Sequence, residues 1–238
     1  MIEIKENKNK FIECIGLLPG LVVETDITFG QEGIFIKAVH PSNHCMLILK
    51  ISKDLFEKYE FESDITYTIQ MEELLKILSC LKNDTLIISN QPDYIDFKDG
   101  RRHFKLNYFV GSKDVRPVPE FEHKFIFDID SKEFFNNTAD CLTFDQIGNY
   151  QIQENKLKLN SKSHMIKGTF DLAATITNSG ECQAYFDLSY IALVKGLKNL
   201  FKDVNVRIDN DLPLIIKGNN ALFDAQFILA NRVGEENE

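Results

Sequence analysis

The chain has 238 residues, of which 44% are hydrophobic and 26% charged, a balance typical of folded globular proteins. Its formal net charge of −9 argues against a nucleic-acid binder whose whole surface is basic. No run of about 20 apolar residues is available to span a bilayer, and the N-terminus lacks the apolar segment of a signal peptide. We therefore expect a cytoplasmic protein, or a nuclear one if its source is eukaryotic, without a membrane partner.

The first half of the chain predicts two helices among short strands. A strand at residues 1–6 precedes a helix at 7–18, in which Phe11, Cys14 and Ile15 recur at helical spacing. A second amphipathic helix is predicted at residues 71–83. Alternating or continuous apolar runs predict strands at residues 21–29, 33–40, 45–52, 66–70, 84–89, 93–100 and 101–109.

The second half repeats this order of elements, although the residues themselves differ. Its helices are predicted at residues 131–142 and 188–201, the latter as one continuous helix. A turn is predicted at residues 153–155, between two strands of the segment 143–163. Further strands are predicted at residues 124–130, 166–174, 182–188, 204–209, 212–218 and 221–230.

These patterns predict an α+β protein of two similar domains, each with two helices packed on antiparallel sheet. Residues 109–123 include two prolines and mixed charge without strand or helix periodicity, and we predict an extended connector there. The domains would then span residues 1–108 and 124–233, followed by an acidic tail at 234–238.

The cysteines predict neither a disulfide framework nor a metal site, because they lie far apart without a C-x-x-C pair. The five histidines show no metal-ligand spacing, and we expect no metal or other cofactor. We expect buried free thiols, which behave as small apolar side chains, at Cys14, Cys45, Cys80, Cys141 and Cys182.

Four stretches in order resemble the PCNA family of DNA sliding clamps, and the resemblance covers nearly the whole chain. They are GIFIKAVHPSNHCMLILKISKDLFEKYEF, ITYTIQMEELLKILSCLKNDTLIIS, NDLPLIIKG and FILANRV. The resemblance implies the DNA clamp fold, with three subunits closed head to tail into a ring that has helices on its inner wall. Edge strands near residues 103–109 and 165–172 would pair between neighbours, in a homotrimer or in a heterotrimer with paralogues; the alternative is that they are solvated edges of a monomer.

The family also implies a function. The ring would encircle duplex DNA without sequence specificity, act as a processivity factor for DNA polymerase and recruit replication and repair proteins. The implied partners include a clamp loader, a ligase and a nuclease, and the implied location is the nucleoid region of the cytoplasm or the nucleus.

Contacts from lysine to phosphate carry no sequence information, so an acidic chain can surround DNA if its basic residues are confined to the inner wall. Lys195, Lys198 and Lys202 fall on one stripe of the predicted last helix, although a solvated helix face would give the same stripe. Together with the positions implied by the family, the predicted DNA-contacting residues are Lys10, Lys76, Lys105, Lys195, Lys198 and Lys202.

Members of the family bind short partner peptides in an apolar groove between the connector, an early loop and the C-terminal segment. Asn231 stands where the family usually has proline, and Ile228 where it often has an aromatic residue. An equally open alternative for single members of the set is an ordinary core position. The implied groove residues are Val39, Met46, Val115, Val118, Pro119, Pro213, Ile228, Ala230, Asn231 and Val233.

The sequence contains no nucleophile–base pair, paired-carboxylate motif or phosphate-binding loop, and we expect no enzymatic activity. Two alternatives to a sliding clamp stay open. One is a clamp-like checkpoint or scaffold protein without routine DNA tethering. The other is an α+β hydrolase or transferase with an unfamiliar active site.

Overall fold

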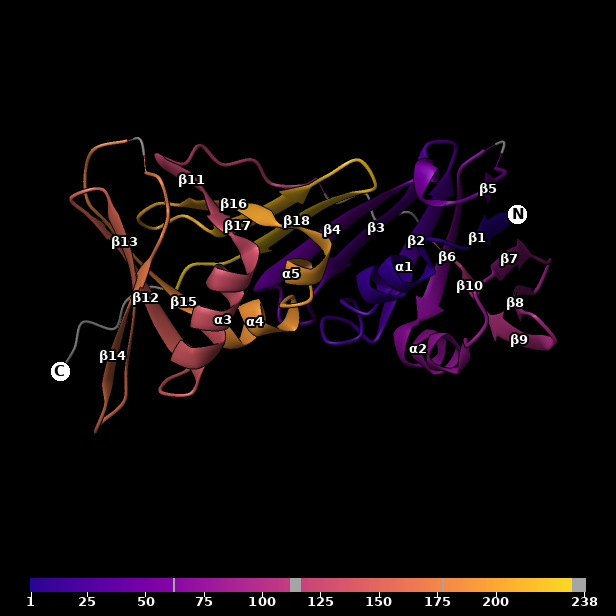
Figure 1. Ribbon diagram of the computed structural model, residues 1–238, viewed down its shortest axis with the longest axis horizontal. Helices are drawn as coiled ribbons and strands as arrows, with labels where there is room; N and C mark the ends of the chain where they lie inside the picture. Colours follow the sequence, from indigo (N-terminus) through magenta and orange to yellow (C-terminus); the bar gives the residue numbers. More distant parts are fainter. Residues whose placement is uncertain (62, 112–116, 177, 233–238) are drawn as a thin grey trace. The chain divides into compact units, whose positions relative to one another are not determined.

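A computed structural model describes residues 1–61, 63–111, 117–176 and 178–232 of the chain (Figure 1). The chain forms two compact units. The first comprises Met1–Pro41, Leu47–Pro117 and Asn219–Ala225, and the second comprises Ser42–Met46, Val118–Gly218 and Gln226–Glu238. Val115, Val233 and the predicted tail 234–238 lie outside the described residues.

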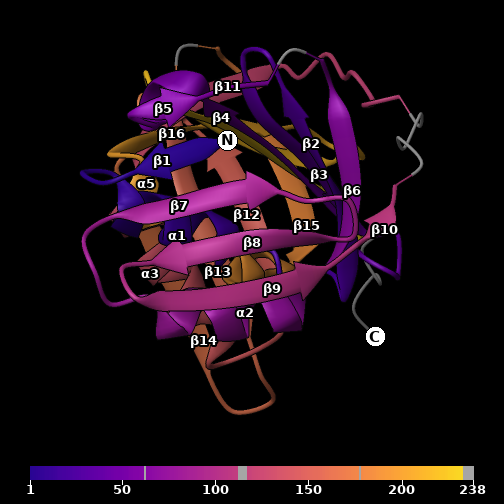
Figure 2. The same ribbon diagram turned by 90° about the vertical axis from the view of Figure 1, so that its right-hand side faces the viewer.

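The described part of the first unit contains two helices and two antiparallel sets of strands. One set has the order β5-β1-β7-β8-β9 and the other the order β10-β6-β2-β3-β4. Figure 2 shows β7, β8 and β9 side by side. The elements are β1 (Ile2–Ile4), α1 (Lys8–Ile15), β2 (Glu24–Gly30), β3 (Gly33–Val39), β4 (Cys45–Ser52, its first two residues in the second unit), the 3-10 helix η1 (Lys53–Leu55), β5 (Lys58–Tyr59), β6 (Ile65–Gln70), α2 (Met71–Cys80), β7 (Leu86–Asn90), β8 (Tyr94–Asp99), β9 (Arg102–Asn107) and β10 (Phe109–Val110).

Both predicted helices of this unit are confirmed, but each is shorter than predicted. α1 buries Phe11, Cys14 and Ile15, and α2 buries Met71, Leu74 and Leu78, as their apolar spacing requires. α2 ends where Leu81 turns to an extended conformation at ψ 116°. The short strand β5 and the helix η1 are additions that the sequence pattern does not predict.

A buried carboxylate joins α1 to the turns that follow α2 and β8. Asp99 is fully buried and accepts hydrogen bonds from the backbone N–H groups of Lys82 at 2.9 Å and Asn83 at 3.0 Å. The amine of Lys8, at the start of α1, lies 3.7 Å from an Asp99 oxygen and donates to the carbonyl of Asn83. Gly100 follows at φ +64°, in the left-handed region that favours glycine.

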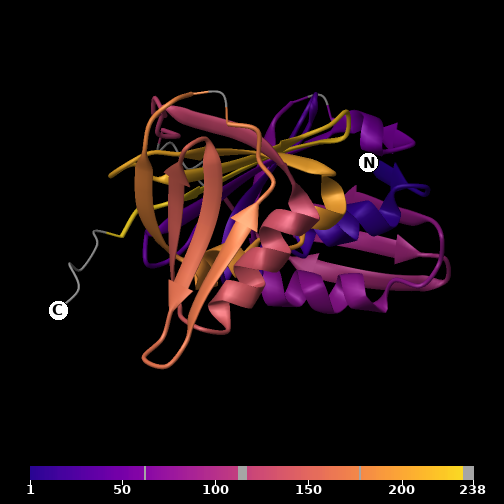
Figure 3. The same cartoon turned by 60° about the vertical axis from the view of Figure 1, so that its left-hand side comes forward.

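The second unit likewise has two antiparallel sets of strands in its described part, in the orders β14-β13-β12-β15 and β18-β17-β16-β11. Figure 3 shows the four-stranded set in orange tones with α3 beside it. The elements are β11 (Phe125–Asp130), α3 (Ser131–Leu142), β12 (Ile147–Gln153), β13 (Lys156–Lys162), β14 (Lys167–Leu172), β15 (Cys182–Asp187), α4 (Leu188–Leu193), α5 (Leu197–Leu200), β16 (Asp203–Ile208), β17 (Leu214–Asn219, its last residue in the first unit) and β18 (Phe223–Leu229, its first three residues in the first unit).

The prediction of one continuous last helix is wrong. α4 ends at Leu193, because Val194 leaves the helical region at φ −103°, ψ 15°. A turn through Gly196 separates it from α5, whose last residue is Leu200. Glycine weakens a helix interior, since it loses more backbone freedom on folding than other residues.

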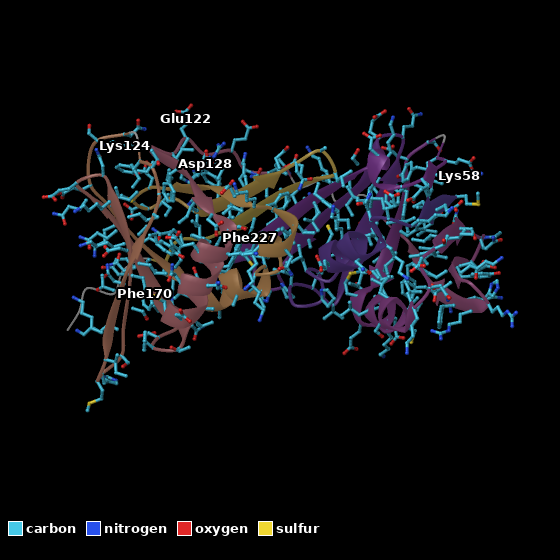
Figure 4. The ribbon with its side chains drawn as sticks, in the orientation of Figure 1. Lys58, Glu122, Lys124, Asp128, Phe170 and Phe227 are labelled. Carbon is cyan, nitrogen blue, oxygen red and sulfur yellow. The ribbon has the colours of Figure 1, made fainter. Side chains whose placement is uncertain are left out.

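A buried hydroxyl pair anchors α3 to the four-stranded sheet. Tyr150 on β12 is fully buried, and its hydroxyl lies 3.0 Å from that of Thr138 on α3. Thr138 in turn donates to the carbonyl of Phe134 at 2.8 Å. In the same unit Phe227 lies inside, whereas Lys124 and Asp128 are exposed (Figure 4).

The prediction that all five thiols are buried is wrong at Cys80, which is exposed at the end of α2. Burial raises the pKa of the other four thiols, those of Cys14, Cys45, Cys141 and Cys182, to about 12. The described residues contain no group of His, Cys, Asp or Glu side chains placed to hold a metal ion. Among them, no helix is both long and apolar enough to cross a membrane.

Candidate DNA-contacting and partner-binding surfaces

Three of the predicted DNA-contacting lysines lie close together in the sequence around the broken last helix. Lys195 is exposed in the turn between α4 and α5, and Lys198 is half-buried within α5. Lys202 is exposed after α5, next to Phe201, which is extended at φ −127°, ψ 136°. Because the helix is interrupted, the three do not form the single helical stripe that a continuous helix would give.

Hydrogen bonds to α3 hold the segment from Lys198 to Lys202 in place. The side-chain amine of Lys198 donates to Oδ1 of the Asn136 side chain at 2.8 Å. The backbone N–H of Ser131 donates to the carbonyl of Lys202 at 2.9 Å, and its hydroxyl donates to the carbonyl of Phe201. The backbone that carries Lys198 and Lys202 is therefore attached to the helix beside it.

The other three predicted lysines belong to the first unit and occupy different elements. Lys10 is exposed on α1, which also exposes Glu13. Lys76 on α2 pairs with Glu73 at 2.7 Å, and this hydrogen bond is the main cause that raises the pKa of the Lys76 amine. Lys105 is exposed on β9, with its amine 4.5 Å from the centre of the Tyr94 ring.

The predicted groove residues of the second unit gather around two segments that are far apart in sequence. The backbone N–H of Ala230, just after β18, donates to the carbonyl of His44 at 2.8 Å. The N–H of Arg232 donates to the carbonyl of Tyr185 at 2.8 Å, next to the half-buried Asn231. The turn at residues 42–46 is thus joined to the C-terminal segment.

Exposure divides the predicted groove residues. Ile228 is only 6% exposed, whereas Val118 is 37% exposed. Pro119 is exposed, and the half-buried members are Val39 in the first unit and Met46, Pro213, Ala230 and Asn231 in the second. Val115 and Val233 are not among the described residues.

The sequence pattern does not reveal the polar contacts around the predicted groove residues. The Tyr190 hydroxyl on α4 lies 3.1 Å from the Ser42 hydroxyl and 3.2 Å from His44 Nδ1. His123 Nε2 donates to the carbonyl of Pro213 at 2.7 Å, which attaches the end of the predicted connector to the turn before β17. No spacing in the sequence could pair residues 42 and 190, because only the folded chain brings them together.

Comparison with known proteins gives consistent matches along the chain. The family model described as "Proliferating cell nuclear antigen, N-terminal domain" matches residues 1–104. Proliferating cell nuclear antigen of Saccharomyces cerevisiae is 25% identical, over 99% of this chain and 100% of its own length. The "Probable DNA polymerase sliding clamp 2" of Paramecium bursaria Chlorella virus 1 is 22% identical, over 92% of this chain and 85% of its own.

The solved structures extend the match to the whole fold. Proliferating cellular nuclear antigen from Entamoeba histolytica superposes with a TM-score of 0.86 at 23% identity, covering 98% of each chain. This chain has the PCNA-type clamp fold. A PCNA2–PCNA3 complex from Sulfolobus tokodaii also superposes, with a TM-score of 0.85 at 18% identity, covering 97% of this chain and 98% of that one.

The PCNA-type fold gives a context for two strands at the edges of their sheets. In the described part of the chain, β9 pairs only with β8, and β14 pairs only with β13. Both strands therefore leave one row of backbone groups without a partner strand. They overlap the segments near residues 103–109 and 165–172, for which the family resemblance implies contacts between subunits.

Proposed function

We propose that this chain is one subunit of a ring-shaped sliding clamp that encircles duplex DNA without reading its sequence and serves as a processivity factor for DNA polymerase. The observation that carries the proposal is the match, over at least 85% of both chains, to relatives named as DNA polymerase sliding clamps. The fold agrees with that reading, since two solved PCNA structures superpose on at least 97% of the chain.

In the proposed ring the lysines contact the DNA backbone. Lys195 and Lys202 are exposed, and side chains of this type neutralise phosphates without reading bases. Lys10, Lys76 and Lys105 would add weaker contacts, because acidic side chains accompany the first two and Lys105 lies against Tyr94. Confining the basic residues to one surface reconciles the function with a net charge of −9.

The second part of the proposal concerns partner proteins. Met46, Val118, Pro119, Ala230 and Asn231 would line a groove that takes short peptides from a polymerase, clamp loader, ligase or nuclease. The proposed connector at residues 109–123 would form one side of this groove. We propose no catalytic activity for the chain itself, because several of its relatives are named as sliding clamps.

A topological experiment tests the proposal. The complete ring, with partner chains where it needs them, is loaded onto a nicked circular plasmid and isolated by gel filtration. A clamp stays with the circle and is lost when one restriction cut makes the plasmid linear, because it slides off the ends. Retention that is the same before and after the cut would mean ordinary DNA binding and would contradict the proposal. A complex that never remains with the circle would favour the scaffold alternative.

A further inference from the structure

One face of the four-stranded sheet in the second unit carries a row of lysines. Side chains alternate along a strand, so residues two apart on β13 stand on the same face. Lys162 is paired directly with Lys167 of β14, which places both side chains on one face of the sheet. We call this surface the lysine face, and its basic members, all exposed or half-buried, are Lys156, Lys158, Lys162 and Lys167.

The opposite face of the same sheet packs against α3. Leu157 and Leu159, which alternate with the lysines on β13, are buried. The Ser161 hydroxyl, on that buried side, donates to the Cys141 carbonyl of α3 at 3.0 Å. The helix thus lies on one side of the four-stranded sheet (Figure 1), and the lysines stand on the other. The lysine face is therefore separate from the candidate DNA-contacting segment of this unit, which is bonded to α3.

No carboxylate in the described part of the chain neutralises the lysine face. None of its four side-chain amines makes an ion pair or a hydrogen bond there, and Asp171 forms no ion pair with Lys158 although the two are directly paired in the sheet. In the first unit, by contrast, six lysines lie 2.7–3.7 Å from a carboxylate oxygen. They are Lys5, Lys8, Lys50, Lys53, Lys58 and Lys76.

Protection of a sheet edge does not account for this row. Lysines on an edge strand discourage pairing with another chain, but only Lys167 is on the edge strand β14. The other three belong to β13, which lies between β12 and β14. Lysine is disfavoured within strands, and like charges directly opposite each other, as at Lys162 and Lys167, destabilise a sheet. An anionic group bound on this face would relieve the repulsion.

The geometry of the lysine face fits an extended acidic peptide. Alternate side chains of a strand are about 6.8 Å apart, twice its rise per residue, and alternate residues of an extended peptide have the same spacing. Carboxylates at every second position can therefore reach Lys156 and Lys158 together. A hollow of about 340 Å³ lies beside these two lysines and is also lined by Asp171. The neighbouring strand β12 adds hydrogen-bonding amides on the same face, from Asn149, Gln151 and Gln153.

We infer that the lysine face is a docking surface for an acidic segment of another protein, in which aspartate or glutamate recurs at every second position. The inference goes beyond the proposed clamp function, because it uses neither the candidate DNA-contacting lysines nor the predicted groove residues. Nucleic acid fits this face less well, since β12, β13 and β14 place no aromatic side chain there on which a base could stack. Opposite charges would also steer the acidic segment to the face.

Binding of a defined peptide to the whole chain tests the inference. A fluorescent peptide in which glutamate alternates with serine is titrated with the chain at about 50 mM NaCl, and fluorescence anisotropy gives the Kd. The same peptide with glutamine in place of glutamate is the neutral control. The variant Lys158→Gln/Lys162→Gln removes two charges from the lysine face. Lys50→Gln/Lys53→Gln removes two exposed charges from the first unit, and thermal unfolding checks that each variant is folded.

We expect the acidic peptide to bind the wild type and the first-unit variant with equal Kd, and to bind Lys158→Gln/Lys162→Gln about tenfold more weakly. If that variant does not fold, Lys156→Gln/Lys167→Gln makes the same test with the other two lysines. The neutral peptide should not bind.

Three results would overturn the inference. Absence of binding at about 1 mM chain, or a Kd that is the same for all variants or for both peptides, would mean that the lysines only solvate the sheet. A short single-stranded or duplex oligonucleotide that binds more tightly than the peptide, and loses affinity in the same variants, would assign the face to nucleic acid. Each result leaves the plasmid test of the clamp proposal unchanged, so either proposal can fail alone.

Discussion

Lys198 on α5 donates a hydrogen bond of 2.8 Å from its amine to the side-chain carbonyl of Asn136 on α3. Lys198 is one of the three lysines that we assign to DNA contact, and this bond uses one of its N–H donors and holds its side chain against α3. Among the described residues, neither Lys195 nor Lys202 makes such a side-chain bond, and both are exposed. The three lysines are therefore not equivalent, although they are similar in sequence.

Replacing Lys195 or Lys202 by alanine should weaken retention of the ring on circular DNA and reduce its salt dependence. A plot of log affinity against log salt concentration has a negative slope, and each lost phosphate contact should reduce the magnitude of that slope by about one. Lys198→Ala should change the slope less, because its amine is already bonded to Asn136. Lys53→Ala is a matched control, since Lys53 is exposed on η1 and pairs with Glu32 at 3.0 Å. Equal slopes for the wild type and both single variants would remove Lys195 and Lys202 from the DNA-contacting surface.

Substitutions in the proposed groove should separate partner binding from DNA retention. Met46→Glu and Val118→Glu each place a charge on a partly exposed apolar position of the second unit. We expect at least about a tenfold loss in stimulation of a cognate polymerase, because burying an unpaired charge against an apolar peptide is costly. Retention on circular DNA should stay as in the wild type. Full stimulation by both variants would place the partner site elsewhere.

Removing the Asp99 carboxylate should destabilise the first unit strongly. Asp99→Ala leaves the Lys82 and Asn83 N–H groups without their acceptor and the buried Lys8 amine without its counter-charge, so we expect a loss of about 3 kcal/mol in the free energy of unfolding. Chemical denaturation measures this loss. Asp84→Ala, an exposed position in the same turn, is the control and should change stability little. Equal losses of unfolding free energy for the two variants would show that the contacts of the buried Asp99 carboxylate do not stabilise the first unit.

The same carboxylate predicts a pH dependence. Burial by itself raises the pKa of Asp99, but the hydrogen bonds from Lys82 and Asn83 and the charge of Lys8 outweigh burial and hold the pKa below its usual value. A group with a lowered folded pKa stabilises the fold fully above its unfolded pKa, about 3.9. The stability gap between the wild type and Asp99→Asn should therefore be constant near neutral pH. It should narrow as pH falls below about 4, and a gap that grows with acidification would contradict the assignment.

The hydroxyl pair of Thr138 and Tyr150 predicts unequal effects from its two deletions. Tyr150→Phe leaves Thr138 bonded to the Phe134 carbonyl and should cost about 1 kcal/mol of unfolding free energy. Thr138→Val leaves a fully buried tyrosine hydroxyl without its partner, and should cost more, about 2 kcal/mol. Denaturation of both single variants and the double variant measures the difference. The reverse order of the two losses would contradict the geometry.

Local periodicity was sufficient to predict much of the fold. The helix at residues 131–142 has the predicted bounds, because Asp130 caps it by accepting from the Glu133 N–H at 2.9 Å and apolar residues recur on one face. The predicted turn at residues 153–155 contains Glu154 at φ 51° and Asn155 at φ 59°, as a tight hairpin turn requires. The order of the elements, repeated in both halves, predicts two similar α+β domains, and the family resemblance adds the clamp fold.

The sequence by itself thus determined most of the elements, the repeat and the family resemblance, since each of these depends on neighbouring residues. Only the tertiary structure decided that Val194 and Gly196 interrupt the last helix, that Asn136 bonds Lys198, and that the turn at His44 meets Ala230. The last two of these features join residues that are distant in the chain, and the packing that selects among such contacts leaves no local pattern in the sequence.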